Sequence, residues 1–445
     1  MAASLKVYST VLTTTLLASA VCYYAFAGQG HDIASQSAAE GSVRNQEISH
    51  SQVSAKKEKT DGEEQVIMND PAIQQAWGLK KSDAARAWQV ALGSRKIVVA
   101  VIDTGADVHH EDLAKNIWTN PGETGVDKFG HDKSNNGIDD DGNGFVDDVH
   151  GWNFVSNNND LTDNHGHGTH IAGIIGAEAG NGKGIAGIAP QVSMMILKYY
   201  DPKVPNTDNL RNTVNAIKYA VMMKNKYGIN IDVINYSGGG TEYSQDEHDA
   251  IVEARKSSIL YVAAAGNERS NSDQHKYFPA DYGLSNIISV TAIDPSTEVL
   301  PSSNYGTATV DIAAPGQNIL STLPGNQYGF MTGTSQATAF VTGAAVLVMS
   351  RHEDSSPEEV KKYILSTGDS EISLLAKCRT SKQLNLYKAV TMLDSGVGVS
   401  GVIAANTGNM KSFTTDGNNE SARGISSFGQ ALMQNLESKQ APKKN

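Results

Sequence analysis

Three short segments, far apart in the chain, carry residue types that together could perform nucleophilic catalysis. Asp103 lies in Asp-Thr-Gly, His167 in His-Gly-Thr-His, and Ser335 in Gly-Thr-Ser-Gln-Ala-Thr. A neutral imidazole, with a pKa of about 6.5, can take a serine hydroxyl proton at neutral pH and pass it to a leaving group. A carboxylate beside the imidazole would hold its tautomer and stabilise the imidazolium. The three residues therefore predict acyl-transfer chemistry with an acid, a base and a nucleophile.

Each segment also has a simpler interpretation. Asp-Thr-Gly is a common turn, and a serine at a helix start is usually an N-cap. His165, His167 and His170 form His-x-His-x-x-His, a pattern that could hold zinc. Zinc hydrolases with this pattern usually have an aspartate directly before the last histidine, where this chain has Thr169. A zinc hydrolase is therefore an alternative, weaker than serine catalysis.

The segments that must position these residues have the pattern of a parallel α/β domain. Residues 96–102 read Lys-Ile-Val-Val-Ala-Val-Ile, as expected of a strand buried on both faces. Asp103 follows directly, so its carboxylate would lie at the carboxyl end of a central strand, where sites form in open α/β sheets. Further strands and helices alternate along the chain. The expected strands are 192–197, 231–235, 259–265 and 287–292, and the expected helices are 209–226, 245–257 and one from the Ser356 cap to about 365.

The three motifs and their order resemble those of the subtilisin-like serine proteases, the subtilase family. The resemblance covers residues 69–394. It implies a three-layer subtilisin-like α/β fold, in which helices flank a central, mostly parallel sheet. It also implies a serine endopeptidase in which His167 is the base, while His165 and His170 are structural. The chain departs from the family at positions 339–340, where Ala-Phe replaces the usual Pro-His, a change expected to affect only the packing of that helix.

The same resemblance assigns residues that bind the substrate. Asn267 follows an expected strand in Ala-Ala-Gly-Asn, as in the family, and is expected to donate to the oxyanion. An extended peptide would pair between two segments. These are Ser237, Gly238 and Gly239 at the edge, and Ala264, Ala265 and Gly266 on the facing wall. Gly238 predicts an open subsite because relatives often have a larger residue there. Glu268 at the rim favours a basic P1 side chain, and Tyr277 is expected to narrow the pocket floor.

Two groups of oxygen-bearing residues are candidates for structural Ca²⁺. Acidic and amide side chains alternate in the segment 136–148 around two glycines, which is typical of a calcium loop, although the distal glutamate of an EF-hand is missing. Its expected ligands are Asp139, Asp141, Asn143 and Asp147. The family resemblance implies a second site, which would join Asp112 with the backbone around Asn181 in residues 180–184. The alternative for the first group is a solvated acidic loop.

Composition and the chain ends restrict the class of protein. The 445-residue chain has a formal net charge of −12, which argues against nucleic-acid partners, because phosphate binding needs clustered Lys and Arg. Residues 1–27 read as a signal peptide that ends in Ala-Phe-Ala, with an uncleaved anchor or lipidation at Cys22 as alternatives. Cleavage would leave Cys378 as the only cysteine, so no internal disulfide is expected. We expect a short disordered pro-segment or linker at 28–65, a catalytic domain at 66–394 and a flexible tail at 395–445.

These features predict an exported serine endopeptidase, secreted or periplasmic, that acts as a monomer on protein or peptide substrates. No stable membrane span is expected after cleavage of the signal peptide. One further alternative is a catalytically silent subtilase scaffold that serves as a calcium-dependent binding module.

Overall fold

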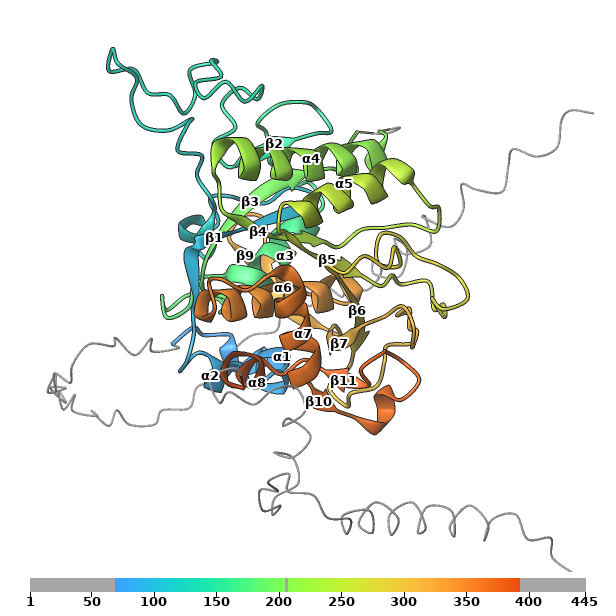
Figure 1. Ribbon diagram of the computed structural model, residues 1–445. Helices are drawn as coiled ribbons and strands as arrows, with labels where there is room; N and C mark the ends of the chain where they lie inside the picture. Colours follow the sequence, from blue (N-terminus) through green and yellow to red (C-terminus); the bar gives the residue numbers. More distant parts are fainter. Residues whose placement is uncertain (1–68, 205–206, 393–445) are drawn as a thin grey trace, which may run out of the picture. The chain divides into compact units, whose positions relative to one another are not determined.

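A nine-stranded sheet organises the part of the chain that the structure, a computed structural model, describes: residues 69–204 and 207–392. The expected signal peptide, the polar segment at 28–65 and the tail at 395–445 lie outside these residues. The strand order is β10-β11-β7-β6-β5-β4-β1-β3-β2, and every pairing is parallel except β10 with β11 (Figure 1). The strands are β1 (Gly93–Asp103), β2 (Gly151–Asn153), β3 (Gln191–Lys198), β4 (Ile231–Tyr236), β5 (Leu260–Ala264), β6 (Ile287–Ile293), β7 (Ile312–Pro315), β10 (Asp369–Ser370) and β11 (Lys382–Gln383).

Strand β1 lies inside this sheet, which explains the apolar run that predicts it. It pairs with β3 on one side and with β4 on the other. Val99 and Val101 join one hydrophobic cluster, whereas Val98, Ala100 and Ile102 join another. Successive side chains of a strand point to opposite faces, so both faces of β1 are buried. The five strands expected from the sequence are all confirmed, with ends that differ by a few residues.

Helices cover both faces of the sheet and complete the three layers expected of the subtilisin-like fold. Buried residues of α3, α6, α7 and α8 pack on one face, and those of α4 and α5 pack on the other (Figure 1). The helices are α1 (Trp77–Lys81), α2 (Ala84–Ala87), α3 (His167–Gly176), α4 (Asn209–Tyr227), α5 (Gln245–Lys256), α6 (Thr334–Arg351), α7 (Pro357–Thr367) and α8 (Leu386–Thr391), with short 3₁₀ turns η2 (Ile73–Gln75), η3 (Ala114–Asn116) and η4 (Ile372–Leu374). Within the described ranges, no helix is long and apolar enough to cross a membrane.

Local caps begin the helices that the sequence predicts. Helix α7 starts with a capping box, in which Ser356 Oγ accepts from the Glu359 backbone N–H and the Glu359 carboxylate accepts from the Ser356 N–H. Pro357 occupies its first position. The Asp208 and Ser244 side chains cap α4 and α5 by accepting from the Arg211 and Glu247 N–H groups. Each cap contributes about 1 kcal/mol, so these boundaries are set by neighbouring residues.

A two-stranded antiparallel hairpin, β8 (Ile319–Leu323) with β9 (Gln327–Met331), was not predicted. Its polar side chains bind the backbone of α3: Ser321 Oγ donates to the carbonyl of His170 at 2.7 Å, and Thr322 Oγ1 donates to that of Thr169 at 2.7 Å. These contacts join residues about 150 positions apart, which explains why the local hydrophobic pattern does not reveal the hairpin.

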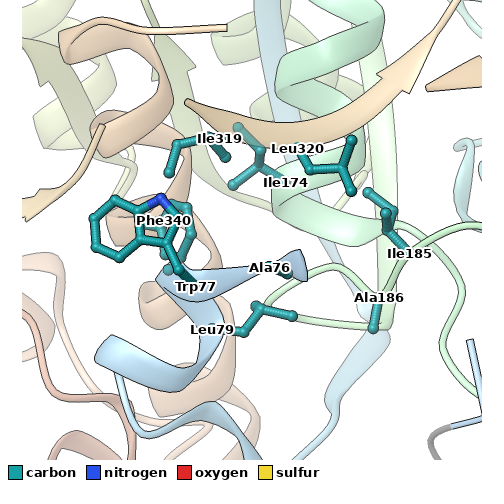
Figure 2. Close-up of a pocket in the computed structure, with 10 residues that line it drawn as sticks. Ala76, Trp77, Leu79, Ile174, Ile185, Ala186, Ile319, Leu320 and Phe340 are labelled. Atoms are coloured by element: carbon teal, nitrogen blue, oxygen red, sulfur yellow. The ribbon is translucent and has the colours of Figure 1, made fainter. Parts of the chain in front are cut away.

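Helix α1 packs against α6 at the position where the chain departs from the family pattern. Phe340 is 3 % exposed, and a Cβ on Gly78 would lie 2.5 Å from its Cζ. Trp77 donates its indole N–H to the Gln317 carbonyl at 2.9 Å. An apolar cavity of about 20 Å³ remains beside these rings, with Ile174 and other aliphatic side chains around it (Figure 2). Phe340 is therefore a core residue, and the cavity is a packing gap that holds at most one water.

Candidate active site

The carboxylate of Asp103 and the imidazole of His167 are in direct contact. Asp103 ends β1 and is 2 % exposed, and its Oδ1 accepts from His167 Nδ1–H at 2.7 Å and from the Thr104 N–H at 2.8 Å. His167 is the first residue of α3. A Cβ at the next position, Gly168, would overlap the carbonyl oxygen of Gly105. Only glycine therefore lets the helix start this close to the end of β1.

The pKa of His167 is raised by its surroundings. Burial lowers this pKa, but the charge of Asp103 and its hydrogen bond raise it, and the charge of Asp163 adds to them. The net direction is upward because the two carboxylates outweigh the loss of solvation. The His167 side chain is 21 % exposed, so one edge of the ring remains accessible.

Asp163 is a buried carboxylate that the sequence analysis missed. Its Oδ1 accepts from Thr104 Oγ1 at 2.8 Å and from the backbone N–H groups of His165 and Gly166 at 3.0 and 2.8 Å. Its Oδ2 accepts from the N–H and the hydroxyl of Thr169 at 2.8 and 2.7 Å. Asp163 therefore joins the turn after β1 to the first turn of α3. The signal available in the sequence was an acid four residues before the expected base.

Ser335 lies in the first turn of α6, as the sequence predicts. It is 7 % exposed, and its hydroxyl donates to the Ser237 carbonyl at 3.2 Å. Among the described residues, no hydrogen bond joins it to His167. The Ser237 hydroxyl in turn donates to the Ser335 carbonyl at 3.4 Å, so the segment after β4 lies beside the start of α6. A helix start offers free backbone N–H groups and the positive end of the helix dipole.

Asn267 also lies at the start of α6. Its Oδ1 accepts from the Thr334 N–H at 3.0 Å and from the Thr334 hydroxyl at 3.3 Å. The side chain is exposed. Because the carbonyl of the amide is held by the residue before Ser335, its NH₂ group remains available to an oxygen at the same helix start.

The three histidines of His-x-His-x-x-His do not converge. His170 is fully buried, with Nε2 at 2.9 Å from the Ile319 carbonyl and 3.2 Å from that of Gly329. Burial, followed by the charge of His167, lowers the pKa of His170 to about 4, so it is neutral at pH 7. His165 is exposed and its ring centroid is 6.1 Å from that of His167. This geometry does not support the zinc alternative, because His167 Nδ1 faces Asp103 and His170 Nε2 faces backbone carbonyls.

The segments expected to bind the substrate face each other near Ser335, but the subsite at Gly238 is not open. A Cβ at Gly238 would lie 2.5 Å from the hydroxyl of Tyr199 and 2.8 Å from that of Tyr236. The space that the missing side chain leaves is therefore filled by two phenols, and the expectation of an open subsite is wrong. On the facing wall, Ala264 and Ala265 are 2 % and 1 % exposed, so they contribute mainly backbone to this surface.

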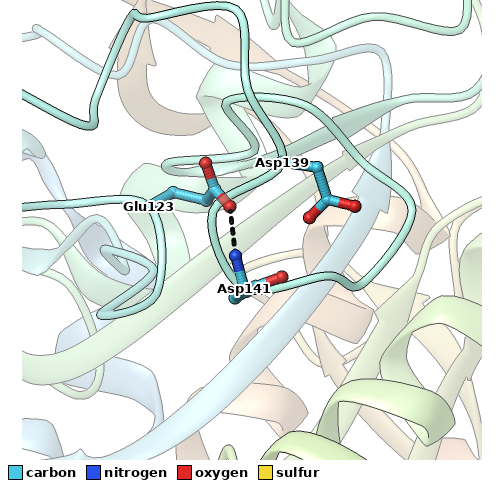
Figure 3. A group of neighbouring side chains, drawn as sticks. All are labelled: Glu123, Asp139 and Asp141. Carbon is cyan, nitrogen blue, oxygen red and sulfur yellow. Dashed lines mark hydrogen bonds between the residues drawn. The ribbon is translucent and has the colours of Figure 1, made fainter. Parts of the chain in front are cut away.

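One group of carboxylates could hold a metal ion. The ligand oxygens of Glu123, Asp139 and Asp141 lie within 4.8 Å of one another (Figure 3). Glu123 is buried, and its Oε1 accepts from the N–H groups of Asp140 and Asp141 at 2.8 and 3.1 Å. Its Oε2 is buried without a hydrogen-bond partner in the described residues. Burial, with the charges of Asp141 and Asp140 adding to it, raises the pKa of Glu123, so a bound cation would relieve both costs.

Two of the expected ligands in this loop have other partners. The Asn143 amide donates to Asp148 Oδ2 at 2.8 Å and to Asp141 Oδ2 at 3.2 Å. The Asp147 carboxylate accepts from the backbone N–H groups of Asn136 and Gly137, both at 3.0 Å. Asp147 is not among the carboxylates that lie within 4.8 Å of one another, and Glu123 takes its place. The Asn143 side-chain carbonyl accepts from the Phe145 N–H at 2.7 Å. An oxygen-rich pattern does not show which side chains the loop turns inward.

Asp112 and Asn181, which the expected second calcium site would bring together, are in contact. Asp112 accepts from the Asn181 amide at 2.7 Å, from the Ile185 N–H at 3.0 Å and from the Tyr328 hydroxyl at 3.1 Å. The carbonyl oxygen of the Asn181 side chain accepts from the Lys183 N–H at 2.8 Å. Asn181 therefore presents its NH₂ group to Asp112, and the backbone around Asn181 stays the predicted source of the other ligands.

Comparisons with known proteins agree with this architecture. A sequence model described as the subtilase family matches residues 94–399. The major intracellular serine protease of Bacillus subtilis is 34 % identical over 278 residues, which are 62 % of this chain and 76 % of that protein. Thermitase of Thermoactinomyces vulgaris is 33 % identical over 323 residues, covering 72 % of this chain and 98 % of that protein. A solved protease structure from Pseudoalteromonas arctica superimposes with a TM-score of 0.57 at 28 % identity, covering 73 % of this chain and 98 % of that one.

Proposed function

Because this chain belongs to the subtilase family of serine proteases, we propose that it is an endopeptidase in which Asp103, His167 and Ser335 form the catalytic triad. The observation that carries the proposal is the 2.7 Å contact between His167 Nδ1 and Asp103. This contact fixes the tautomer in which Nε2 is free to accept a proton. Ser335 at the start of α6 supplies the hydroxyl that would give it up.

The reaction follows from these positions. Ser335 Oγ attacks the carbonyl carbon of the peptide bond while its proton passes to His167 Nε2. The tetrahedral oxygen would accept hydrogen bonds from the Ser335 backbone N–H and from the Asn267 amide. His167 then protonates the leaving amine, and water releases the acyl group by the same path in reverse. Loss of one oxyanion donor costs about 10²–10³-fold in kcat, a magnitude known from subtilisin.

A covalent probe tests the assignment of the nucleophile. The full chain and its Ser335→Ala variant are treated with a fluorophosphonate probe, and casein hydrolysis is followed in parallel. Ser350→Ala is the matched control, because Ser350 lies in the same helix and its hydroxyl donates to the Leu347 carbonyl. Labelling and hydrolysis should be lost in Ser335→Ala and kept in Ser350→Ala. A folded parent protein that is not labelled would refute the proposal and favour the binding-module alternative.

We propose that a structural Ca²⁺ binds at Glu123, Asp139 and Asp141. Their carboxylates are the hard oxygen ligands that Ca²⁺ prefers. The buried Glu123 Oε2 without a partner supports this assignment, because an ion would satisfy it. Subtilases commonly bind calcium, and here the ion would tie the loop at 136–148 to Glu123.

Export of the protein is also a proposal. It is supported by the charged, apolar and Ala-Phe-Ala segments within residues 1–27. The family does not decide the compartment, since the Bacillus subtilis relative is named an intracellular protease. Cell fractionation with mass spectrometry of the mature N-terminus tests it: a mature chain that begins at Gly28 in the medium or periplasm is expected. A chain that keeps residue 2 at its N-terminus in the cytoplasm would refute it.

A further inference from the structure

We propose that Tyr277 closes the P1 subsite, so that the enzyme cleaves after small side chains such as alanine and disfavours large aromatic or basic ones. This inference rests on the proposed endopeptidase function and specifies its substrate class. Its basis is the position of one aromatic ring between the two backbone segments that flank the nucleophile.

The position of the P1 side chain follows from the contacts of Ser335 and Asn267. The scissile carbonyl carbon must approach Ser335 Oγ, and its oxygen must point toward Asn267. Ser335 Oγ contacts the Ser237 carbonyl on one side, and Asn267 contacts Thr334 on the other. The side chain of the residue that carries this carbonyl therefore enters the space between the segment after β4 and the segment after β5.

The ring of Tyr277 fills that space. A Cβ on Gly239, in the segment after β4, would lie 2.5 Å from Tyr277 Cε1. A Cβ on Gly266, in the segment after β5, would lie 3.0 Å from Tyr277 Cδ1. One ring thus touches both backbones, and only glycines at these positions leave it room. A P1 side chain beyond a few atoms would have to displace the ring.

Backbone hydrogen bonds fix the segment that carries Tyr277. Gly240 and Phe278 exchange two backbone hydrogen bonds, from Gly240 N–H to Phe278 O at 2.9 Å and from Phe278 N–H to Gly240 O at 2.7 Å. The Tyr277 N–H donates to Asp281 Oδ2 at 2.8 Å. The Tyr277 backbone is therefore fixed next to the substrate edge, so the ring can leave the space only by changing its own side-chain rotamer.

Two further features favour small P1 side chains over basic ones. Tyr199 and Tyr236 occupy the position of a side chain at Gly238, so the pocket cannot extend in that direction. Glu268 Oε2 accepts from the Asn304 amide at 2.7 Å, so part of its charge is satisfied within the protein. The Tyr277 ring lies beside Glu268, because a Cβ on Gly266 would lie 2.4 Å from Glu268 Oε2 and 3.0 Å from Tyr277 Cδ1. The size limit set by Tyr277 should therefore determine the P1 preference more than the charge of Glu268 does.

Peptides that differ only at P1 test the proposal on the full chain. With P1 alanine, kcat/KM should exceed that with P1 phenylalanine or lysine by about 10², near the upper end of what pocket shape achieves. Tyr277→Ala should raise kcat/KM for P1 phenylalanine at least tenfold relative to alanine, and Tyr277→Phe should keep the parent preference. Tyr243→Ala is the matched control: Tyr243 is 53 % exposed and its ring lies 5.5 Å from that of Phe278.

The outcomes separate the two proposals. A parent protein that reacts with the fluorophosphonate but cleaves equally well after phenylalanine overturns the subsite inference and leaves the proposed function intact. A preference for lysine at P1 also overturns it, in favour of Glu268. Absence of labelling refutes the proposed function and, with it, the inference. The parent profile alone decides the question if Tyr277→Ala does not fold.

Discussion

Replacing Asp163 by asparagine tests whether this buried carboxylate positions and polarises His167. The side chain accepts five hydrogen bonds: three at Oδ1 and two, both from Thr169, at Oδ2. An asparagine that keeps its oxygen toward the three donors presents an NH₂ group to Thr169. The threonine hydroxyl can rotate and accept from that group, but the Thr169 N–H loses its acceptor.

The magnitude follows from that one bond. A hydrogen bond to a charged group contributes about 1.5–3 kcal/mol, so Asp163→Asn should lower the free energy of unfolding by about 2 kcal/mol. Most folded domains have about 5–15 kcal/mol in total, so the variant should still fold. Loosening of the first turn of α3 should also lower kcat/KM by roughly 10–100-fold, because small displacements of a catalytic group are costly.

The pH profile separates a charge effect from a purely structural one. The charge of Asp163 raises the pKa of His167, so its removal should move the acid limb of kcat/KM to lower pH. The assay is kcat/KM on a chromogenic peptide between pH 4 and pH 9, with urea unfolding in parallel. Asp160→Asn is the control, because Asp160 lies on the same loop and is exposed. Its carboxylate accepts a hydrogen bond from the Thr162 N–H. An acid limb that stays in place or moves to higher pH in Asp163→Asn would refute the reasoning.

Three further predictions concern the base, the calcium ion and the start of α3. In the parent, kcat/KM should fall as the pH is lowered, with a midpoint above the ordinary histidine pKa of about 6.5. The reason is that the pKa of His167 is raised and its protonated form cannot accept the serine proton. A midpoint below that value would contradict the assigned base. EGTA should lower the melting temperature of the parent, because an ion at 100 times its Kd stabilises by about 2.7 kcal/mol. Glu123→Gln should abolish this response and Asp132→Asn, in an exposed part of the same loop, should keep it; equal responses would exclude the site. Gly168→Ala should reduce kcat/KM by about 10² or more, because its Cβ meets the Gly105 carbonyl, and a fully active variant in the same peptide assay would show that α3 can shift without harm.

Local sequence was sufficient for the elements that carry the site. The run at 96–102 predicts β1 because a strand buried on both faces has no polar alternation. Ser356 predicts the start of α7 because a cap acts on N–H groups three residues away. The placement of Asp103 at a strand end, and of His167 and Ser335 at helix starts, follows from the same short-range rules.

Only the tertiary structure decided which side chains share a surface with these three. Asp163 reaches Thr104, 59 residues away, and Glu123 joins Asp139 and Asp141 in place of Asp147. Tyr199, Tyr236 and Tyr277 come from separate segments. Their rings fill the space beside Gly238, Gly239 and Gly266, although the sequence predicts an open subsite at Gly238. Hydrophobic periodicity and caps act over a few residues, whereas these contacts depend on how the sheet brings loops together at its carboxyl edge. The sequence by itself therefore determined the elements and the residue types of the chemistry, and packing between distant segments determined the partners, the ligand set and the shape of the substrate pocket.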